Sequence, residues 1–235
     1  MRYALYFTPA RDDRLTIAAS AWLGRDAFGG VAPPVPSVTG LTPSEIAYHT
    51  AAPRRYGFHA TLKAPFALAG AESEASLLAG LDDFAARTCG FAIPRLVIGN
   101  LDGFYALVPA ARLPELDAFA ADVVRFFDPF RVPLSDAEIA RRNPDALKPE
   151  EVRNLVQWGY PYVFETFRFH MTLTGRVAND EAGRVKAALD GVFQPLLGDP
   201  VQVDGIALFV EPEPGAPFTV LSYKALARMP ERRTA

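Results

Sequence analysis

Strict alternation of polar and apolar residues marks one short stretch of the chain, residues 57–65. His59, Thr61 and Lys63 alternate there with small or apolar residues. Because successive side chains of a strand point to opposite faces, this order predicts a strand with one polar and one apolar face. The apolar face can pack beneath a helix, which leaves the polar face for chemistry.

A second stretch, residues 167–174, is sorted in the same way. Arg168, His170, Thr172 and Thr174 alternate with Phe, Phe, Met and Leu. Both stretches contain His-x-Thr-Leu, and they hold two of the chain's three histidines. A solvent-exposed sheet face usually carries Lys, Glu, Thr and Ser instead, so the matched histidines favour a functional interpretation.

Each stretch also opens the same series of predicted elements: strand, helix, strand, strand. The shared position of the motif within this series predicts an internal duplication. The periodicity indicates strands at 57–65, 91–98 and 103–109 with a helix at 71–88 in the first copy, and strands at 167–174, 201–210 and 217–224 with a helix at 178–194 in the second.

The remaining pattern adds elements outside the repeats. It predicts a strand at 2–8, helices at 12–23, 43–51, 112–127 and 149–158, and an irregular Gly- and Pro-rich loop at 24–41.

The whole is an α+β chain, expected to form one bilobal pseudo-two-fold domain over 1–235, with two antiparallel sheets facing a central cleft and helices outside. Repeat one covers about 55–128 and repeat two about 164–225. The connection 129–163 runs between them, and the segment 1–53 is expected to pack on the lobes.

Composition narrows the class of protein. Half of the 235 residues are hydrophobic and 22% are charged, which is ordinary for a globular protein. The net charge of -3 argues against a protein that coats nucleic acid, although a local basic pocket stays possible. The single Cys89 fits a reducing compartment, and no apolar run is long enough to span a membrane. We therefore expect a cytoplasmic protein without a membrane partner.

Two histidines with two threonines suit cleavage of a phosphodiester. One neutral imidazole can act as a base while a protonated one acts as an acid. The hydroxyls of Thr61 and Thr172 can hold phosphate oxygens, and Lys63 and Arg168 can supply cationic contacts. This scheme needs neither a metal nor a cofactor, so none is expected.

Other candidates are less specific. Tyr3 and Tyr6 lie on opposite faces of the first strand, so at most one can face the cleft, and Tyr56 precedes the first motif. Such aromatic residues can stack on a base or a sugar, but more often they belong to the core. His49, outside the repeats, is expected to be structural or exposed.

Competing site chemistries lack their motifs. A zinc site would use three or four ligands at short spacings, whereas His59 and His170 stand far apart and there is no cysteine pair. Gly-x-x-x-x-Gly-Lys, Gly-x-Gly-x-x-Gly and Gly-x-Ser-x-Gly are all absent from the sequence. Nucleoside triphosphate, dinucleotide and serine-hydrolase functions therefore have no motif to support them.

The paired motifs resemble those of the 2H phosphoesterase superfamily, which is defined by two His-x-Thr/Ser motifs in a bilobal α+β fold. The strings at 56–63 and 167–175, with Arg2-Tyr3-Ala4-Leu5-Tyr6 and the chain length, are similar to its DUF1045 branch, called phosphonate-metabolism proteins. The resemblance implies that His59 and His170 are the acid/base pair and that Thr61 and Thr172 bind phosphate.

The expected function is hydrolysis of a small cyclic or 2′,5′-linked phosphate ester. Genes of the family that the chain resembles tend to lie beside bacterial phosphonate-degradation genes, which suggests a phosphoribosyl cyclic phosphate as the substrate. Two alternatives stay open. One is a phosphate-ester or nucleotide-binding module without turnover. The other is an RNA 2′,3′-cyclic phosphodiesterase or ligase-like RNA-processing enzyme. The sequence does not tell which histidine is the base, nor the oligomeric state.

Overall fold

The computed structural model describes residues 1–228, and it forms an α+β fold with two antiparallel sheets, as the sequence predicts. The strands are β1 (Arg2–Phe7), β2 (Ala60–Phe66), β3 (Phe91–Ile93), β4 (Leu96–Leu101), β5 (Phe104–Pro109), β6 (Met171–Arg176), β7 (Val201–Val203), β8 (Gly205–Glu211) and β9 (Thr219–Ala225).

The helices and 3-10 turns are α1 (Arg14–Leu23), α2 (Pro43–His49), α3 (Ala51–Arg54), α4 (Glu74–Arg87), α5 (Pro114–Phe127), η1 (Asp128–Phe130), α6 (Asp136–Ala140), η2 (Pro144–Ala146), α7 (Pro149–Trp158), η3 (Phe164–Thr166), α8 (Ala182–Phe193) and η4 (Gln194–Leu196).

The larger sheet holds both motif strands side by side. Its order is β4-β5-β6-β2-β1-β8-β9, and β3 pairs with β7 in a separate two-stranded sheet. The motif strand of each copy lies nearer the hairpin of the other copy: β6 pairs with β5 of the first copy, and β2 pairs with β1, which in turn pairs with β8 of the second. The two copies are thus interwoven, and the two motifs meet at the centre of one sheet.

The N-terminal strand is part of this sheet. The sequence predicts that residues 1–53 pack on the lobes, whereas β1 lies between β2 and β8 and joins the two motif strands to the last hairpin. All six residues of β1 but Arg2 are buried. An apolar strand that is buried on both faces needs neighbours on both edges, which a position on the outside would not provide.

Local signals in the sequence set most element boundaries. The side chain of Asp13 caps α1 by accepting from Leu15 N–H at 2.7 Å, and Thr42 with Glu45 forms a capping box at the start of α2. A two-residue turn at Asp102-Gly103 closes the β4–β5 hairpin, where Leu101 pairs with Phe104. The helix expected at 149–158 has the same bounds in the structure.

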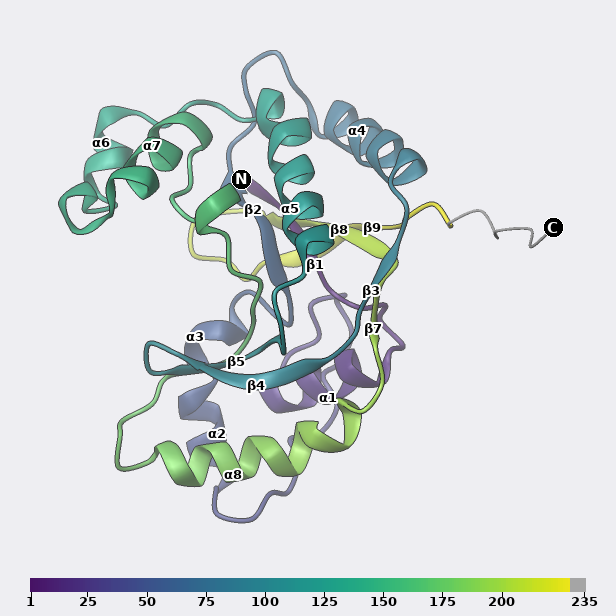
Figure 1. Cartoon of the computed structure of the whole chain (residues 1–235), viewed down its shortest axis with the longest axis vertical. Helices are drawn as coiled ribbons and strands as arrows, with labels where there is room; N and C mark the ends of the chain where they lie inside the picture. The colour runs from purple at the N-terminus through teal and green to yellow at the C-terminus, as the bar shows by residue number, and fades with distance from the viewer. Residues whose placement is uncertain (229–235) are drawn as a thin grey trace.

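Helices cover the sheet in two groups (Figure 1). Helix α5 packs against β2 and α4 against β8 and β9, while α1, α2 and α3 pack against β6 near α8. The main core lies between these helices and the sheet, and it includes Phe7, Leu62 and Leu173. Helix α4 of the first copy therefore covers strands of the second, which again shows that the copies are interwoven.

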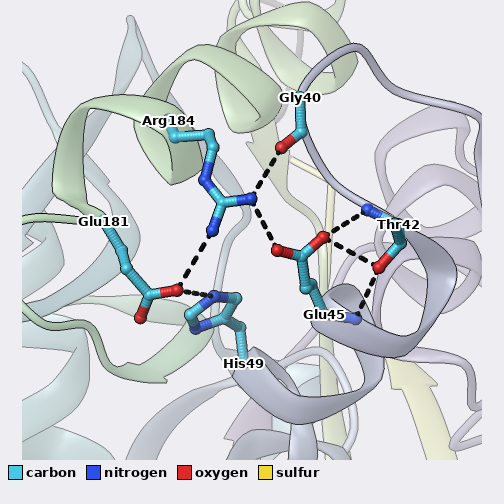
Figure 2. Close-up of polar contacts among 6 residues, drawn as sticks. All are labelled: Gly40, Thr42, Glu45, His49, Glu181 and Arg184. Atoms are coloured by element: carbon cyan, nitrogen blue, oxygen red, sulfur yellow. Dashed lines mark hydrogen bonds and ion pairs between the residues drawn. The ribbon is translucent and has the colours of Figure 1, made fainter.

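Polar contacts join α2 to the start of α8 (Figure 2). Arg184 donates to Gly40 O at 3.1 Å and to Glu45 Oε1 at 2.5 Å, and it also contacts Glu181 at 3.2 Å. His49 is 2% exposed, and its Nε2 lies 3.8 Å from Glu181 Oε1. His49 is therefore buried between the segment that leads into the first motif and the helix that follows the second.

Among the described helices, the structure holds none with the length and apolar character that crossing a membrane requires.

Candidate active site

The register between β2 and β6 brings the two motifs together. Ala60 pairs with Met171, and both side chains are buried in the core. The residues on either side of this pair point to the opposite face of the sheet. In the same register, Thr172 lies across from His59, and Thr61 lies across from His170. The four motif residues thus occupy one patch of the sheet, related by a local two-fold axis through the Ala60–Met171 pair.

Both histidines are held in the same way by their own backbone. His59 Nδ1 lies 3.0 Å from Gly57 O, and His170 Nδ1 lies 2.7 Å from Arg168 O. A carbonyl oxygen only accepts, so Nδ1 carries the proton in each ring and Nε2 of a neutral ring has a free lone pair. Nε2 of His59 lies 3.3 Å from the Thr61 hydroxyl, which therefore donates to it. The arrangement presents two Nε2 atoms, the atoms that exchange protons in acid/base catalysis.

These contacts also explain why the strands begin later than the sequence predicts. Strands β2 and β6 start at Ala60 and Met171, one residue after each histidine. Gly57 has φ +73°, which is outside the strand region, and a Cβ there would lie 2.5 Å from Ala27 Cβ. The tight turn at Gly57 thus needs glycine and delivers the carbonyl that orients His59.

His59 lies among aromatic rings. Tyr6 stacks on it with ring centroids 4.0 Å apart, and the rings of Tyr56 and Phe209 lie at 5.9 and 6.2 Å. Burial, assisted by the nearby His170 and Arg25 and opposed by the hydrogen bond to Gly57, lowers the pKa of His59 to about 4. The ring is therefore neutral near pH 7, as a base must be.

His170 has a more open setting. It lines a cavity of about 560 Å³. The ring of Phe104 lies beside it, with ring centroids 5.9 Å apart. Burial lowers the pKa of His170 below its ordinary value, and the hydrogen bond to Arg168 O opposes this shift. His170, unlike His59, thus faces the cavity directly, where a bound anion would favour its protonated form.

The cavity extends from the motifs to the connecting segment. Thr61, His170 and Arg168 line it on the motif side. The rest of the lining comes from the β4–β5 turn, the first turn of α7 and the segment 160–167. A volume of this size suits a sugar phosphate or a nucleotide. Carboxylates and aromatic rings share the wall with two cations: Asp102, Glu150, Glu151, Glu165, Phe104, Tyr160, Tyr162, Phe167, Lys148 and Arg168.

The other predicted site residues lie near the histidines, except for Tyr3 and Lys63. Tyr6 is 1% exposed and contacts His59, and Tyr56 stacks on Phe218 next to it, so both surround the histidine. Thr172 pairs with Ala106 on the neighbouring strand. Tyr3, on the opposite face, donates to Glu74 at 2.8 Å and takes no part.

The expectation that Lys63 shares a face with His59 and Thr61 is wrong. The β1–β2 ladder has a bulge: Tyr6 pairs with Thr61, but the preceding Leu5 pairs with Lys63. This extra residue reverses the alternation, so Lys63 points into the core, where it is 3% exposed and bonds Asp128 Oδ1 at 2.9 Å.

Thr174 also leaves the polar face. A register shift in the β5–β6 ladder buries it completely, and its hydroxyl accepts from Tyr105 N–H at 2.9 Å. The hydroxyl thus replaces a backbone acceptor that the irregular ladder does not provide.

Sequence analysis missed two residues that shape the site. Arg25 donates to the carbonyls of Arg54 and Arg55 at 3.1 and 2.9 Å, and so it braces the chain just before the first motif. Tyr160 lines the cavity, and burial next to other phenols raises its pKa to about 12, so its hydroxyl stays protonated. Arg25 stands in a glycine-rich segment with no local signal. The Tyr160-Pro161-Tyr162 string did offer an aromatic signal for Tyr160.

No group of three or more His, Cys, Asp and Glu side chains arranged to hold a metal ion is present within residues 1–228.

Comparison with known families identifies the chain. The sequence model described as "Protein of unknown function (DUF1045)" matches residues 61–219, more than half of the chain. The chain belongs to the DUF1045 family.

Two curated relatives carry the name "Ribose 1,5-bisphosphate phosphokinase PhnN". The protein from Janthinobacterium sp. (strain Marseille) is 36% identical over 92% of this chain and 49% of its own length. The one from Laribacter hongkongensis (strain HLHK9) is 40% identical over 93% of this chain and 50% of its own length. The chain thus spans about half the length of these relatives.

Solved structures with similar chains include TT0787 of Thermus thermophilus, with a TM-score of 0.46, 18% identity, and coverage of 97% of this chain and 99% of the other. Escherichia coli LigT complexed with NADP+ has a TM-score of 0.43 and 14% identity, with coverage of 97% and 98%.

Proposed function

We propose that the protein is a metal-independent phosphodiesterase of the 2H type that hydrolyses a small cyclic phosphate ester. One observation carries the proposal: a single strand register gathers His59, Thr61, His170 and Thr172 on one face, and the backbone fixes Nδ1 of both histidines. Two identically held imidazoles with adjacent hydroxyls provide a base, an acid and donors to phosphate oxygens.

The environments of the two rings assign their roles. His59 is the base: its neutral Nε2 takes a proton from water as the water oxygen forms a bond to phosphorus. His170 is the acid: its Nε2–H gives a proton to the ring oxygen as the bond from that oxygen to phosphorus breaks. A phosphate anion between the rings favours the protonated form of His170. Water adds across one P–O bond, so the cyclic diester becomes a monoester with a free hydroxyl.

The remaining side chains support these steps. When substrate is bound, the Thr61 hydroxyl turns from Nε2 of His59 to a non-bridging oxygen, which leaves Nε2 free to accept a proton from water. Thr172 donates to the other non-bridging oxygen, and negative charge develops on both. Arg168, at the mouth of the cavity, adds a cationic contact. Tyr6 and Tyr56 keep water from the far side of His59, which preserves its neutral form.

The cavity favours a small ligand over RNA. Its wall carries Asp102, Glu150 and Glu165. These carboxylates would repel the further phosphates of an RNA strand that ran through the cavity. A sugar phosphate has only one further phosphate to place, and Lys148 and Arg168 line the same cavity.

The names of the relatives suggest the sugar. This chain lacks a Gly-x-x-x-x-Gly-Lys loop, so we assign the kinase chemistry of the relatives to the half that this chain does not match. Ribose 5-phosphate with a five-membered cyclic phosphate at C1 and C2 would open to ribose 1,5-bisphosphate, the compound in their name. Such a step belongs to phosphonate catabolism, as the family resemblance implies.

Phosphorus NMR of the purified chain with this cyclic phosphate and with 2′,3′-cyclic AMP tests the proposal. The expected result is conversion of the cyclic signal to a monoester signal, unchanged by EDTA and absent in the His59→Ala/His170→Ala double variant. Inhibition by EDTA would overturn the metal-independent scheme. Binding without conversion would favour the non-catalytic alternative.

A further inference from the structure

Three charged side chains, Lys63, Asp128 and Arg131, form a network behind the motif strand β2, in which Lys63 and Arg131 are buried and Asp128 is 24% exposed. Asp128 Oδ1 accepts from Lys63 Nζ and from Arg131 Nε, both at 2.9 Å. The side chains of Lys63 and Arg131 are 3% and 7% exposed. The network begins two residues after Thr61, at Lys63, which points away from the site although the sequence predicts it there.

Arg131 extends the network to the wall of the cavity. Its Nη2 donates to Gln157 O at 3.0 Å, in the last turn of α7, and its Nη1 donates to Val132 O at 3.2 Å. A Cβ on Gly159, which has φ +77° and ends α7, would lie 3.1 Å from Cδ and Nη1 of Arg131. The guanidinium thus packs directly beneath the turn that leads to Tyr160.

A second set of bonds keeps the residues after Tyr160 attached to α7. The buried Asn154 donates to Val163 O at 3.2 Å, and the Thr166 hydroxyl donates to Pro161 O at 2.7 Å. The segment after Tyr160 is thus bonded to α7, and the network at Arg131 bonds the last turn of α7 to β2.

The charges themselves are a poor means of stabilising the fold. Burial lowers the pKa of Lys63, against the hydrogen bond and charge of Asp128. Burial also acts to raise the pKa of Asp128, but hydrogen bonds from Arg131 and Lys63 outweigh it and hold that pKa below its usual value. Buried ion pairs are often replaced by apolar residues without loss of stability, whereas their hydrogen bonds fix direction and distance. Fixed geometry is thus the property that this network supplies best.

We propose that Lys63, Asp128 and Arg131 are positioning residues that hold α7 and Tyr160 at a set distance from the motif strand and thereby set the affinity of the cavity for substrate. They touch no substrate themselves. This inference rests on the proposed phosphodiesterase function. It also gives Lys63 a role that differs from the phosphate contact expected from the sequence.

The kinetic test is Asp128→Asn, which keeps the shape of the side chain and removes its charge. We expect KM for the cyclic phosphate to rise about tenfold, with kcat changed by less than about threefold, because the motif residues stay in place. Asp117→Asn is the matched control: it breaks a pair with Arg112 on the exposed side of α5 and should leave both constants unchanged. A purely structural role would lower the apparent kcat with the folded fraction and leave KM unaltered, which would overturn the proposal.

A triple variant separates position from stability. Lys63→Met/Asp128→Leu/Arg131→Met replaces the network with apolar side chains and should keep Tm close to that of the parent protein. KM should still be raised, because no directed bond then holds Gln157 and Gly159. A wild-type KM in a stable triple variant would refute the inference.

Hydrogen exchange makes the test independent of turnover. In Asp128→Asn and in the triple variant, amides of residues 149–162 should exchange faster, while those of β1 and β8 should not change. If the wild-type protein hydrolyses none of the cyclic phosphates, the proposed function fails, and exchange still decides whether the network positions α7. Unchanged exchange at 149–162 in both variants would overturn the positioning role by itself.

Discussion

The two His-x-Thr motifs have the same local sequence and the same backbone hydrogen bond, yet their surroundings differ. His59 lies against Tyr6, with ring centroids 4.0 Å apart, and near Tyr56 and Arg25, whereas His170 faces a cavity whose wall carries several carboxylates. Burial lowers the pKa of both rings, and for His59, which lies among aromatic rings, it lowers the pKa to about 4. The repeated motif thus supplies two like imidazoles, and the packing around them makes their environments different, which is the basis of the roles that we propose.

Removal of either imidazole should have the largest effect. His59→Ala and His170→Ala should each lower kcat for the cyclic phosphate by about 100-fold or more, the usual scale of acid/base catalysis. A p-nitrophenyl phosphodiester sharpens the comparison, since its leaving group needs no proton. It should restore much of the activity of His170→Ala and little of that of His59→Ala. Restoration of the His59 variant instead would reverse the assignment.

The pH dependence of kcat/KM should follow the free-enzyme pKa values of both rings. Activity should rise as pH passes upward through about 4, where His59 loses its proton and becomes a base. It should fall at a pH below 6.5, where His170, whose pKa is lowered from that ordinary value, loses the proton that it must donate. Steady-state rates at low substrate concentration check this profile. A plateau that extends above pH 8 would show that His170 is not the acid.

Tyr6 should account for much of the difference between the two rings. Tyr6→Leu removes the stacked ring and admits water to His59, so the pKa of His59 should move from about 4 toward 6.5. The change also costs about 0.5 to 3 kcal/mol of stability, because Tyr6 is almost fully buried and the smaller side chain leaves a cavity. NMR titration of the imidazole signals measures the shift. Tyr6→Phe keeps the ring and should leave this pKa unchanged; an equal shift in both variants would implicate the hydroxyl instead.

The threonines should show the smallest effects. Thr61→Val removes a hydroxyl that donates to Nε2 of His59, and Thr172→Val removes its counterpart across the strand pair. Each should reduce kcat by about tenfold, because one neutral hydrogen bond contributes about 1 kcal/mol and about 1.4 kcal/mol corresponds to a tenfold change in rate. Thr61→Ser and Thr172→Ser should recover the activity in the same assay. Failure of both serine variants to do so would point to packing by the methyl group.

The sequence alone indicated most of the elements and the four motif residues. It did not show that the strands expected at 91–98 and 201–210 are each divided between the two sheets, nor did it predict α3 and α6. Alternation with period two identified the strands, and the helix caps identified several helix ends, because both depend on residues that are close along the chain. The histidines and threonines stood out because the same string occurs at matched places in two copies. Local patterns were therefore enough to identify the residues that we place at the centre of the site.

Tertiary structure decided how these elements combine. No local signal showed that the copies exchange partners, that β1 lies inside the sheet, or that a bulge turns Lys63 into the core beside Asp128. Each of these depends on which strand lies next to which and in what register, and pairing is set by the packing of distant residues. The same holds for the difference between His59 and His170. A pKa responds to whatever surrounds the ring, and residues as distant in sequence as Tyr6 and Arg25 surround His59 only in the folded chain.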